Sequence, residues 1–346
     1  MYLFGDRDPK VAALLQERGF RRLVDALFAA ESLAPPAAPP PVWETALRLG
    51  LLASDGDCYQ AGRKLVLVPA LAERGLVDLL RPALASYVDV TKEVGAELRA
   101  GYGQTAAAER FTWSQVSHSL LAGLFLDLAM GREVLRAGIS RQTVGDTVIW
   151  AFQGVSADNA FGVVAVPAGP PADTRRALFA ELWHHRARRT GPRMNPSLAA
   201  ILLRIARGEP AGGEPKELLY LKHLKLVRTV GSALQLQVPA FRAADTERLL
   251  GPLTEGARRL VAEAIVPALE ILEARHPWWR EKIRHESYRH AAIRLILEYG
   301  VDHVISAGVC DPFLAASEVP VDWGRWLWEE PEGPRTVIPH REASPS

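Results

Sequence analysis

The pair His285 and His290 is the first place in the sequence where metal chemistry could be expected. Residues 285–290 read HESYRH, and two histidines on a helix bind one zinc ion when they lie four residues apart. These two lie five residues apart, which separates them by about 140° around a helix of roughly 100° per residue. We therefore interpret the segment as a surface helix and expect no metal site there.

Nucleophilic catalysis and nucleotide binding have no clear motif either. Gly154 and Ser156 match the first half of the Gly-x-Ser-x-Gly motif, but the closing glycine is missing and we expect a hairpin there. The sequence contains neither the Gly-x-Gly-x-x-Gly fingerprint nor a P-loop motif. Cys310 has no second thiol near it in the sequence. We expect no cofactor, no metal and no catalytic residue. A catalytic site whose residues come together only in the folded chain remains an alternative.

A run of basic residues is the strongest indication of a partner. Residues 184–228 hold ten Lys and Arg against three Glu, a local net charge of +7. Such a patch binds phosphates even on a nearly neutral protein. A solvated face that balances nearby acidic helices is the alternative. The residues expected to contact double-stranded DNA are Arg186, Arg188, Arg189, Arg193, Lys216, Tyr220, Lys222, His223, Lys225 and Arg228. Tyr220, Lys222 and His223 are expected on the exposed side of their helix, opposite Leu218, Leu221 and Leu224.

The nine tryptophans are numerous for this length. Aromatic side chains line pockets for flat or cationic ligands, and they also fill cores and interfaces. A pocket for a small aromatic or cationic effector is the weaker of these two interpretations. Its expected residues are Trp113, Trp150, Trp278, Trp279 and Trp326.

Composition limits the classes of protein that remain. The chain has 346 residues, of which 48% are hydrophobic, and a formal net charge of +1. These values exclude a largely disordered chain and a coiled coil. The first residues lack the pattern of a signal peptide, and no apolar run is long enough to span a membrane. Cys58 and Cys310 lie too far apart to indicate a disulfide framework, so we expect a cytoplasmic protein and no membrane partner.

The chain resembles itself when it is displaced by about 170 residues. At an offset of 170, residues 68–70 (Val-Pro-Ala) fall on residues 238–240, and Pro82 falls on Pro252. Upstream the offset becomes 175, and one gap of five residues between residues 52 and 66 reconciles the two. Coincidence among leucine-rich helices is the alternative. Because the matches keep their order and the gap lies at a plausible loop, we predict an internal duplication with repeats at 1–170 and 171–346.

Both repeats are predicted to contain the same elements. An amphipathic helix at 20–33 or 196–207 precedes a proline- or glycine-rich break and a second helix. A hairpin follows, with a turn at 54–57 and a return strand at 64–68, or a turn at 230–232 and a strand at 234–238. Long helices are predicted at 71–100, 111–138, 245–276 and 283–307. Closing hairpins are predicted to pair 147–152 with 161–166, and 326–328 with 336–338. The expected fold class is mainly α with short β-hairpins, that is, α+β.

The order helix, helix, hairpin resembles the winged-helix superfamily. The segments that carry the resemblance are 46–59 (ALRLGLLASDGDCY) and 219–228 (LYLKHLKLVR). They are similar to small bacterial winged-helix repressors and to the dimerisation domain of class I O-methyltransferases. The resemblance implies a DNA-binding helix with a wing. The break between the first two helices leaves no room for a normal positioning helix in either repeat.

We therefore expect a winged-helix-type, DNA-binding transcription regulator without enzymatic activity, in which the second repeat contacts phosphates. A scaffold of degenerate winged helices that binds a protein or a small molecule is the alternative. An enzyme whose site is invisible in the sequence is the third possibility.

Overall fold

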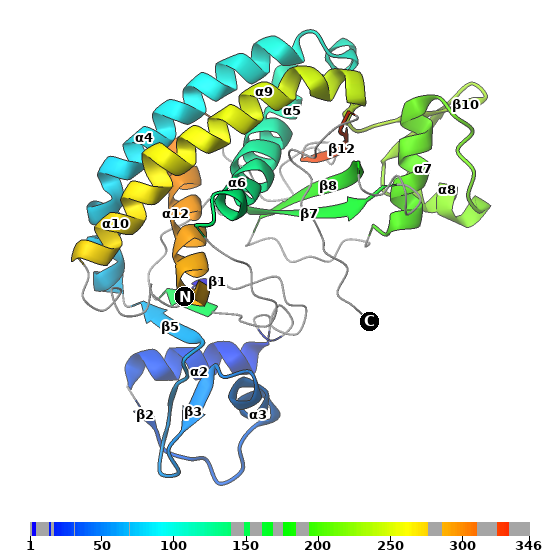
Figure 1. Ribbon diagram of the computed structural model, residues 1–346. Coiled ribbons are helices and arrows are strands. Elements are labelled where there is room, and N and C mark those ends of the chain that lie inside the picture. Colours follow the sequence, from blue (N-terminus) through cyan, green and yellow to red (C-terminus); the bar gives the residue numbers. More distant parts are fainter. Residues whose placement is uncertain are drawn as a thin grey trace. The chain divides into compact units, whose positions relative to one another are not determined.

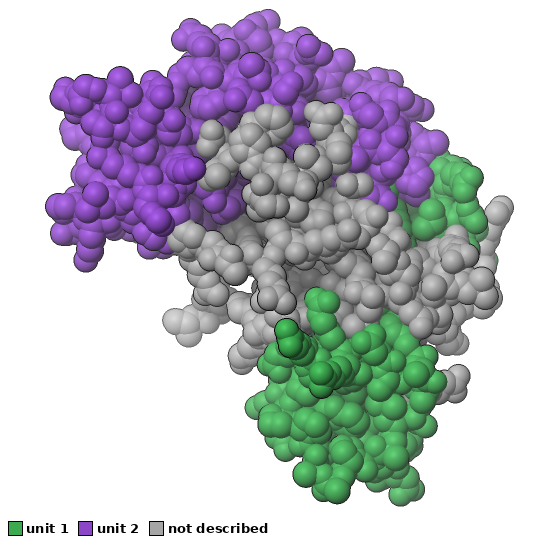
Figure 2. Space-filling model, turned by 180° about the vertical axis from the view of Figure 1, so that it is seen from behind, with its two compact units in different colours: residues 1–83, 138–158, 265–299 green, residues 84–137, 159–264, 300–346 purple. Residues whose placement is uncertain are grey.

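The computed structural model describes residues 2–4, 14, 17–30, 32–68, 70–139, 149–152, 161–168, 176–184, 194–275, 286–309 and 324–331. These residues belong to two compact units, which are distinguished by colour in Figure 2. Unit 1 comprises residues 1–83, 138–158 and 265–299, and unit 2 comprises 84–137, 159–264 and 300–346. The units therefore cut across residues 1–170 and 171–346 instead of coinciding with them.

Unit 1 is built around helix α2 (Arg18–Ala29). Its apolar stripe of Phe20, Leu23, Val24 and Leu27 is buried, as the helical spacing of its leucines predicts. Helix α3 (Pro41–Arg48) starts with a proline, whose missing N–H has no helical acceptor in the first turn. Strands β2 (Ser32–Leu33), β3 (Leu52–Ser54) and β4 (Tyr59–Ala61) form an antiparallel sheet in the order β2-β4-β3.

The turn between β3 and β4 is held by Asp55. Its Oδ1 accepts hydrogen bonds from the backbone N–H groups of Asp57 at 3.2 Å and Cys58 at 2.9 Å. The turn at 54–57 is therefore confirmed, but the predicted return strand at 64–68 is wrong, because β4 returns immediately after the turn. Residues of the predicted strand form β5 (Leu65–Val68), which pairs in parallel with β6 (Ile149–Phe152). Strand β6 also pairs antiparallel with β1 (Tyr2–Phe4), giving the order β1-β6-β5.

Unit 2 contains a four-stranded sheet in the order β11-β12-β8-β7. Its strands are β7 (Phe161–Pro167), β8 (Ala177–His184), β11 (Ala240–Phe241) and β12 (Arg325–Glu329). Strand β12 is parallel to β11 and antiparallel to β8. The predicted hairpin of 147–152 with 161–166 is wrong, because β6 and β7 belong to different sheets. For the other closing hairpin, 326–328 lie in β12, whereas 336–338 lie outside the described residues.

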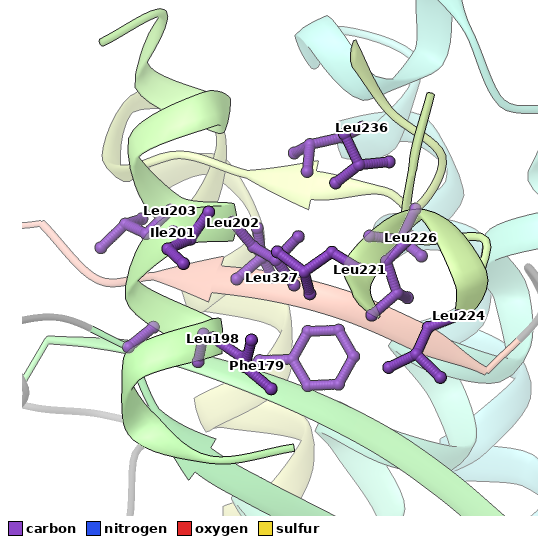
Figure 3. Packing of buried hydrophobic residues seen from close by; sticks show 14 of the residues in the cluster. Phe179, Leu198, Ile201, Leu202, Leu203, Leu221, Leu224, Leu226, Leu236 and Leu327 are labelled. Atoms are coloured by element: carbon purple, nitrogen blue, oxygen red, sulfur yellow. The ribbon is translucent and has the colours of Figure 1, made fainter. Parts of the chain in front are cut away.

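Unit 2 also contains a helix–hairpin module, seen in Figure 1. It consists of helix α7 (Pro196–Arg207), helix α8 (Pro215–His223) and the hairpin of β9 (Val227–Val230) with β10 (Ala233–Leu236). Figure 3 shows its core, in which Leu198 and Leu202 of α7 and Leu221 of α8 pack with Phe179 of β8. Asn195 caps α7 by accepting the N–H of Leu198 at 2.9 Å. Residues 208–214 contain no helix, so the prediction that no positioning helix fits between the first two helices is confirmed here.

The predicted long helices are confirmed. They are α4 (Ala70–Tyr102), the series α5 (Trp113–Ser117), η2 (His118–Ala129) and α6 (Met130–Arg136), the series α9 (Ala243–Leu260), η3 (Val261–Ile265) and α10 (Val266–Arg275), and α12 (Glu286–Ser306). The segment η2 is a fully buried π-helix, which the sequence pattern did not predict. Gly123 lets the Trp326 indole approach it, because a Cβ there would lie 2.3 Å from the ring.

The chain is a mixed α/β protein in which helices predominate, in agreement with the expected α+β class. Among the described residues, no helix combines the length and the apolar character that a membrane span needs.

Candidate nucleic-acid interface

Helix α8 is fixed at both ends. At its start, Glu217 Oε2 accepts the backbone N–H of Glu214 at 2.8 Å, and Ser197 of α7 donates to Glu217 Oε1 at 2.9 Å. These two hydrogen bonds lower the pKa of Glu217, the bond from the Glu214 N–H having the larger effect and the bond from Ser197 the next largest. This carboxylate therefore stays charged at the helix N-terminus. At its end, Arg325 of β12 donates to the Leu224 carbonyl at 3.3 Å and pairs with Glu181 of β8 at 2.9 Å. The helix is therefore held against the sheet of its unit.

The helix–hairpin module exposes five of the predicted DNA-contacting residues. They are Lys216, Lys222, His223, Lys225 and Arg228. Within the described part of the chain, none of the five takes part in an ion pair. Three of them follow one another closely at the end of α8. Lys225 adopts the left-handed conformation, with φ of 56°, where the chain turns from α8 into β9. Cations also interact favourably with the C-terminal end of a helix dipole, which is a purely structural role for Lys222.

The predicted orientation of Tyr220 is wrong. Its side chain is half-buried and packs against the cluster around Leu221, whereas Leu219 is 66% exposed. Tyr220 lies one residue before the buried Leu221 and four before Leu224, so its ring can cover the edge of that apolar stripe. Leu219 takes the outward position instead.

Arg228 belongs to the β9–β10 hairpin. It lies opposite Gln235 in the β9–β10 register, and its Nε donates to Gln235 Oε1 at 2.8 Å. The hairpin turns at Gly231, whose φ of 61° is unfavourable for other residues, and Val230 beside it is 50% exposed.

An open cleft of about 350 Å³ lies where this hairpin meets the segment after η1 (Ala106–Glu109). Its lining residues are Arg110, Phe111, Arg228, Gln235 and Gln237. Arg110 donates from Nη2 to the Leu236 carbonyl at 2.5 Å and lies over the Phe111 ring, 5.4 Å from its centroid. Burial, and secondly the positive charge of Arg228, lowers the pKa of Arg110. Sequence reasoning missed Arg110, because it lies 126 residues from Leu236 along the chain and outside any basic run.

Several predicted site residues are not placed. Arg186, Arg188, Arg189 and Arg193 lie outside the described residues, as do Trp278 and Trp279. The same holds for His285, Gly154, Ser156 and Cys310. His290 and Trp150 are described only as parts of α12 and β6.

The two described tryptophan side chains of the expected effector pocket have different surroundings. Trp326 is completely buried and lies against Gly123, whereas Trp113 is half-buried and contacts Tyr102, with 5.7 Å between ring centroids. Neither lines the cleft at Arg110.

Comparison with models of protein families, with curated proteins and with solved structures finds no match to this chain.

Proposed function

We propose that this protein is a winged-helix-type DNA-binding regulator, without enzymatic activity, in which the helix–hairpin module of residues 196–236 contacts backbone phosphates. The observation that carries the proposal is the set of exposed cations at the end of α8 and on its hairpin, none of them neutralised by an ion pair within the described residues. Cations that are free of carboxylates can replace the counterions of a nucleic acid, and their release favours binding.

The order of elements supports this proposal. A helix bearing Lys222 and His223 is followed directly by a two-stranded hairpin bearing Arg228. This is the order in which a recognition helix and a wing follow each other in the winged-helix superfamily, which the sequence resembles. The absent positioning helix favours contacts to phosphates over reading of base edges, because base contacts need a helix held deep in the major groove.

We also infer that the halves 1–170 and 171–346 are copies of one module. In unit 1, β6 lies between an antiparallel β1 and a parallel β5. In unit 2, β12 lies between an antiparallel β8 and a parallel β11. Among the described elements, each outer pair encloses two helices and an antiparallel hairpin in the sequence, and long helices follow before the central strand. A shared order of this kind, with the same strand directions, supports a duplication.

A titration of labelled duplex DNA, followed by fluorescence anisotropy at several salt concentrations, tests the DNA proposal. We expect the wild-type affinity to fall as salt rises, and we expect Lys222→Glu with Lys225→Glu to weaken binding and to reduce the slope of log K against log salt by about 2. The matched control is Lys92→Glu with Arg99→Glu, which makes the same charge change at exposed positions of α4. Equal losses in both double variants, or no binding by the wild type at low salt, would contradict the proposal.

A scaffold that binds another protein is the second candidate. It is favoured by Leu219 and Val230, two exposed apolar side chains on the same module. Under this alternative, Leu219→Ser would abolish partner binding while DNA remained unbound at every salt concentration.

A further inference from the structure

We propose that the cleft lined by Arg110 and Arg228 binds a phosphate group between its two guanidinium groups. The site combines a residue of the wing hairpin with one that follows η1, outside the helix–hairpin module. Its ligand is therefore recognised by two elements that are far apart in the sequence.

The cleft carries two positive charges, those of Arg110 and Arg228. Within the described residues, neither Arg110 nor Arg228 forms an ion pair, and the cleft is lined by two cations, two amides and a phenyl ring. Two guanidinium groups that face one cleft repel each other. An oxyanion between them replaces this repulsion with two charge-assisted contacts, and guanidinium groups match phosphate geometry with paired donors.

The cleft is also held in place before any ligand arrives. Arg110 is tied to the Leu236 carbonyl, and the segment behind it is anchored where Ala106 N–H donates to Asp245 Oδ1 at 3.0 Å. Tyr102 adds a further bond from its hydroxyl to the Phe111 carbonyl. Because these bonds fix the backbone on both sides of Arg110, little ordering is required on binding.

The glutamines complete the set of donors. Gln235 uses its Oε1 to accept from Arg228, which leaves its amide NH₂ as a donor. Gln237 uses one hydrogen of its Nε2 for the Leu236 carbonyl at 3.0 Å, and the second hydrogen of this NH₂ can serve a ligand. A volume of about 350 Å³ is at the small end for ligand pockets, enough for a phosphate and a group of about the size of a sugar.

Such a phosphate has two sources, a nucleic-acid backbone or a free phosphorylated small molecule. With the first source, the inference rests on the proposed function and extends it to Arg110. With the second source, it is independent of DNA binding.

Thermal unfolding of the full chain with inorganic phosphate, compared with potassium chloride at equal ionic strength, tests the site. We expect a saturable, phosphate-specific rise in Tm for the wild type. We expect Arg110→Gln and Arg228→Gln to weaken the derived phosphate affinity by about tenfold or more. Arg99→Gln on α4 is the matched control and should behave as the wild type. Arg228→Gln keeps the bond between Arg110 and Leu236, so it remains informative if Arg110→Gln is unstable.

Two results would overturn the inference. One is a change in wild-type Tm with phosphate that equals the change with chloride. The other is a phosphate affinity that is the same in the wild type, Arg110→Gln, Arg228→Gln and Arg99→Gln. The DNA titration of Arg228→Gln and Arg110→Gln then identifies the source. A parallel loss of DNA and phosphate affinity indicates backbone phosphates, whereas a loss of phosphate affinity alone indicates a free ligand. Since the phosphate measurement contains no DNA, failure of the DNA proposal leaves it intact.

Discussion

At the scale of single residues, Tyr102 shows how a buried hydroxyl positions the segment that carries Arg110. Its ring lies 5.7 Å from that of Trp113 and 6.3 Å from that of Phe241, and its hydroxyl donates to the Phe111 carbonyl. Burial raises the pKa of Tyr102 to about 12. The phenol therefore stays neutral in the folded chain at pH values where an exposed tyrosine has lost its proton.

This pKa predicts a specific alkaline destabilisation. In the unfolded chain Tyr102 ionises near pH 10, whereas in the folded chain it ionises near 12. Between these values the unfolded chain has released a proton that the folded chain retains, so the free energy of unfolding falls as pH rises. Urea unfolding should show a shallower fall between pH 10 and 12 for Tyr102→Phe than for the wild type, with parallel pH dependence below pH 9. Identical slopes at high pH would contradict the assigned burial effect.

At the scale of elements, α8 offers a matched pair of leucines. Leu221 is completely buried in the module core, whereas Leu219 is 66% exposed. We expect Leu221→Ala to lower the free energy of unfolding by about 2–5 kcal/mol, because it leaves a cavity. Leu219→Ala should change it by about 0.5 kcal/mol or less, since it is a surface substitution. Denaturant unfolding measures both, and similar effects would contradict the described orientation of α8.

Helices and strands differed in how far the sequence could predict them. The stripe of Leu198, Ile201 and Leu202 predicted α7 to the residue, because the period of an amphipathic helix is a local property. Strand β8 was missed, because Ala177–Ala180 are all buried and show no alternation. The strands that pair with β5 and β6 come from distant segments of the chain, so local sequence patterns do not predict these pairings. The same holds for Arg110, whose place in the cleft depends on tertiary contacts.

At the scale of the whole molecule, the inferred duplication predicts a superposition. Placing β1-β6-β5 on β8-β12-β11 should also bring α2, α3 and the β3–β4 hairpin onto α7, α8 and the β9–β10 hairpin. A shared ancestor would preserve both the sheet and the module that it carries. Sheets that match while the hairpins diverge in direction would contradict the duplication, and the DNA titration would remain a separate test of function.

The position of β12 has a consequence for synthesis on the ribosome. This strand, Arg325–Glu329, lies between β8 and β11, both of which precede it in the chain. Until it emerges, β8 and β11 each present an unpaired edge, the kind of surface on which chains aggregate. A product released before residue 325 lacks the middle of its sheet, so premature termination removes far more of the fold than the length of the missing tail implies.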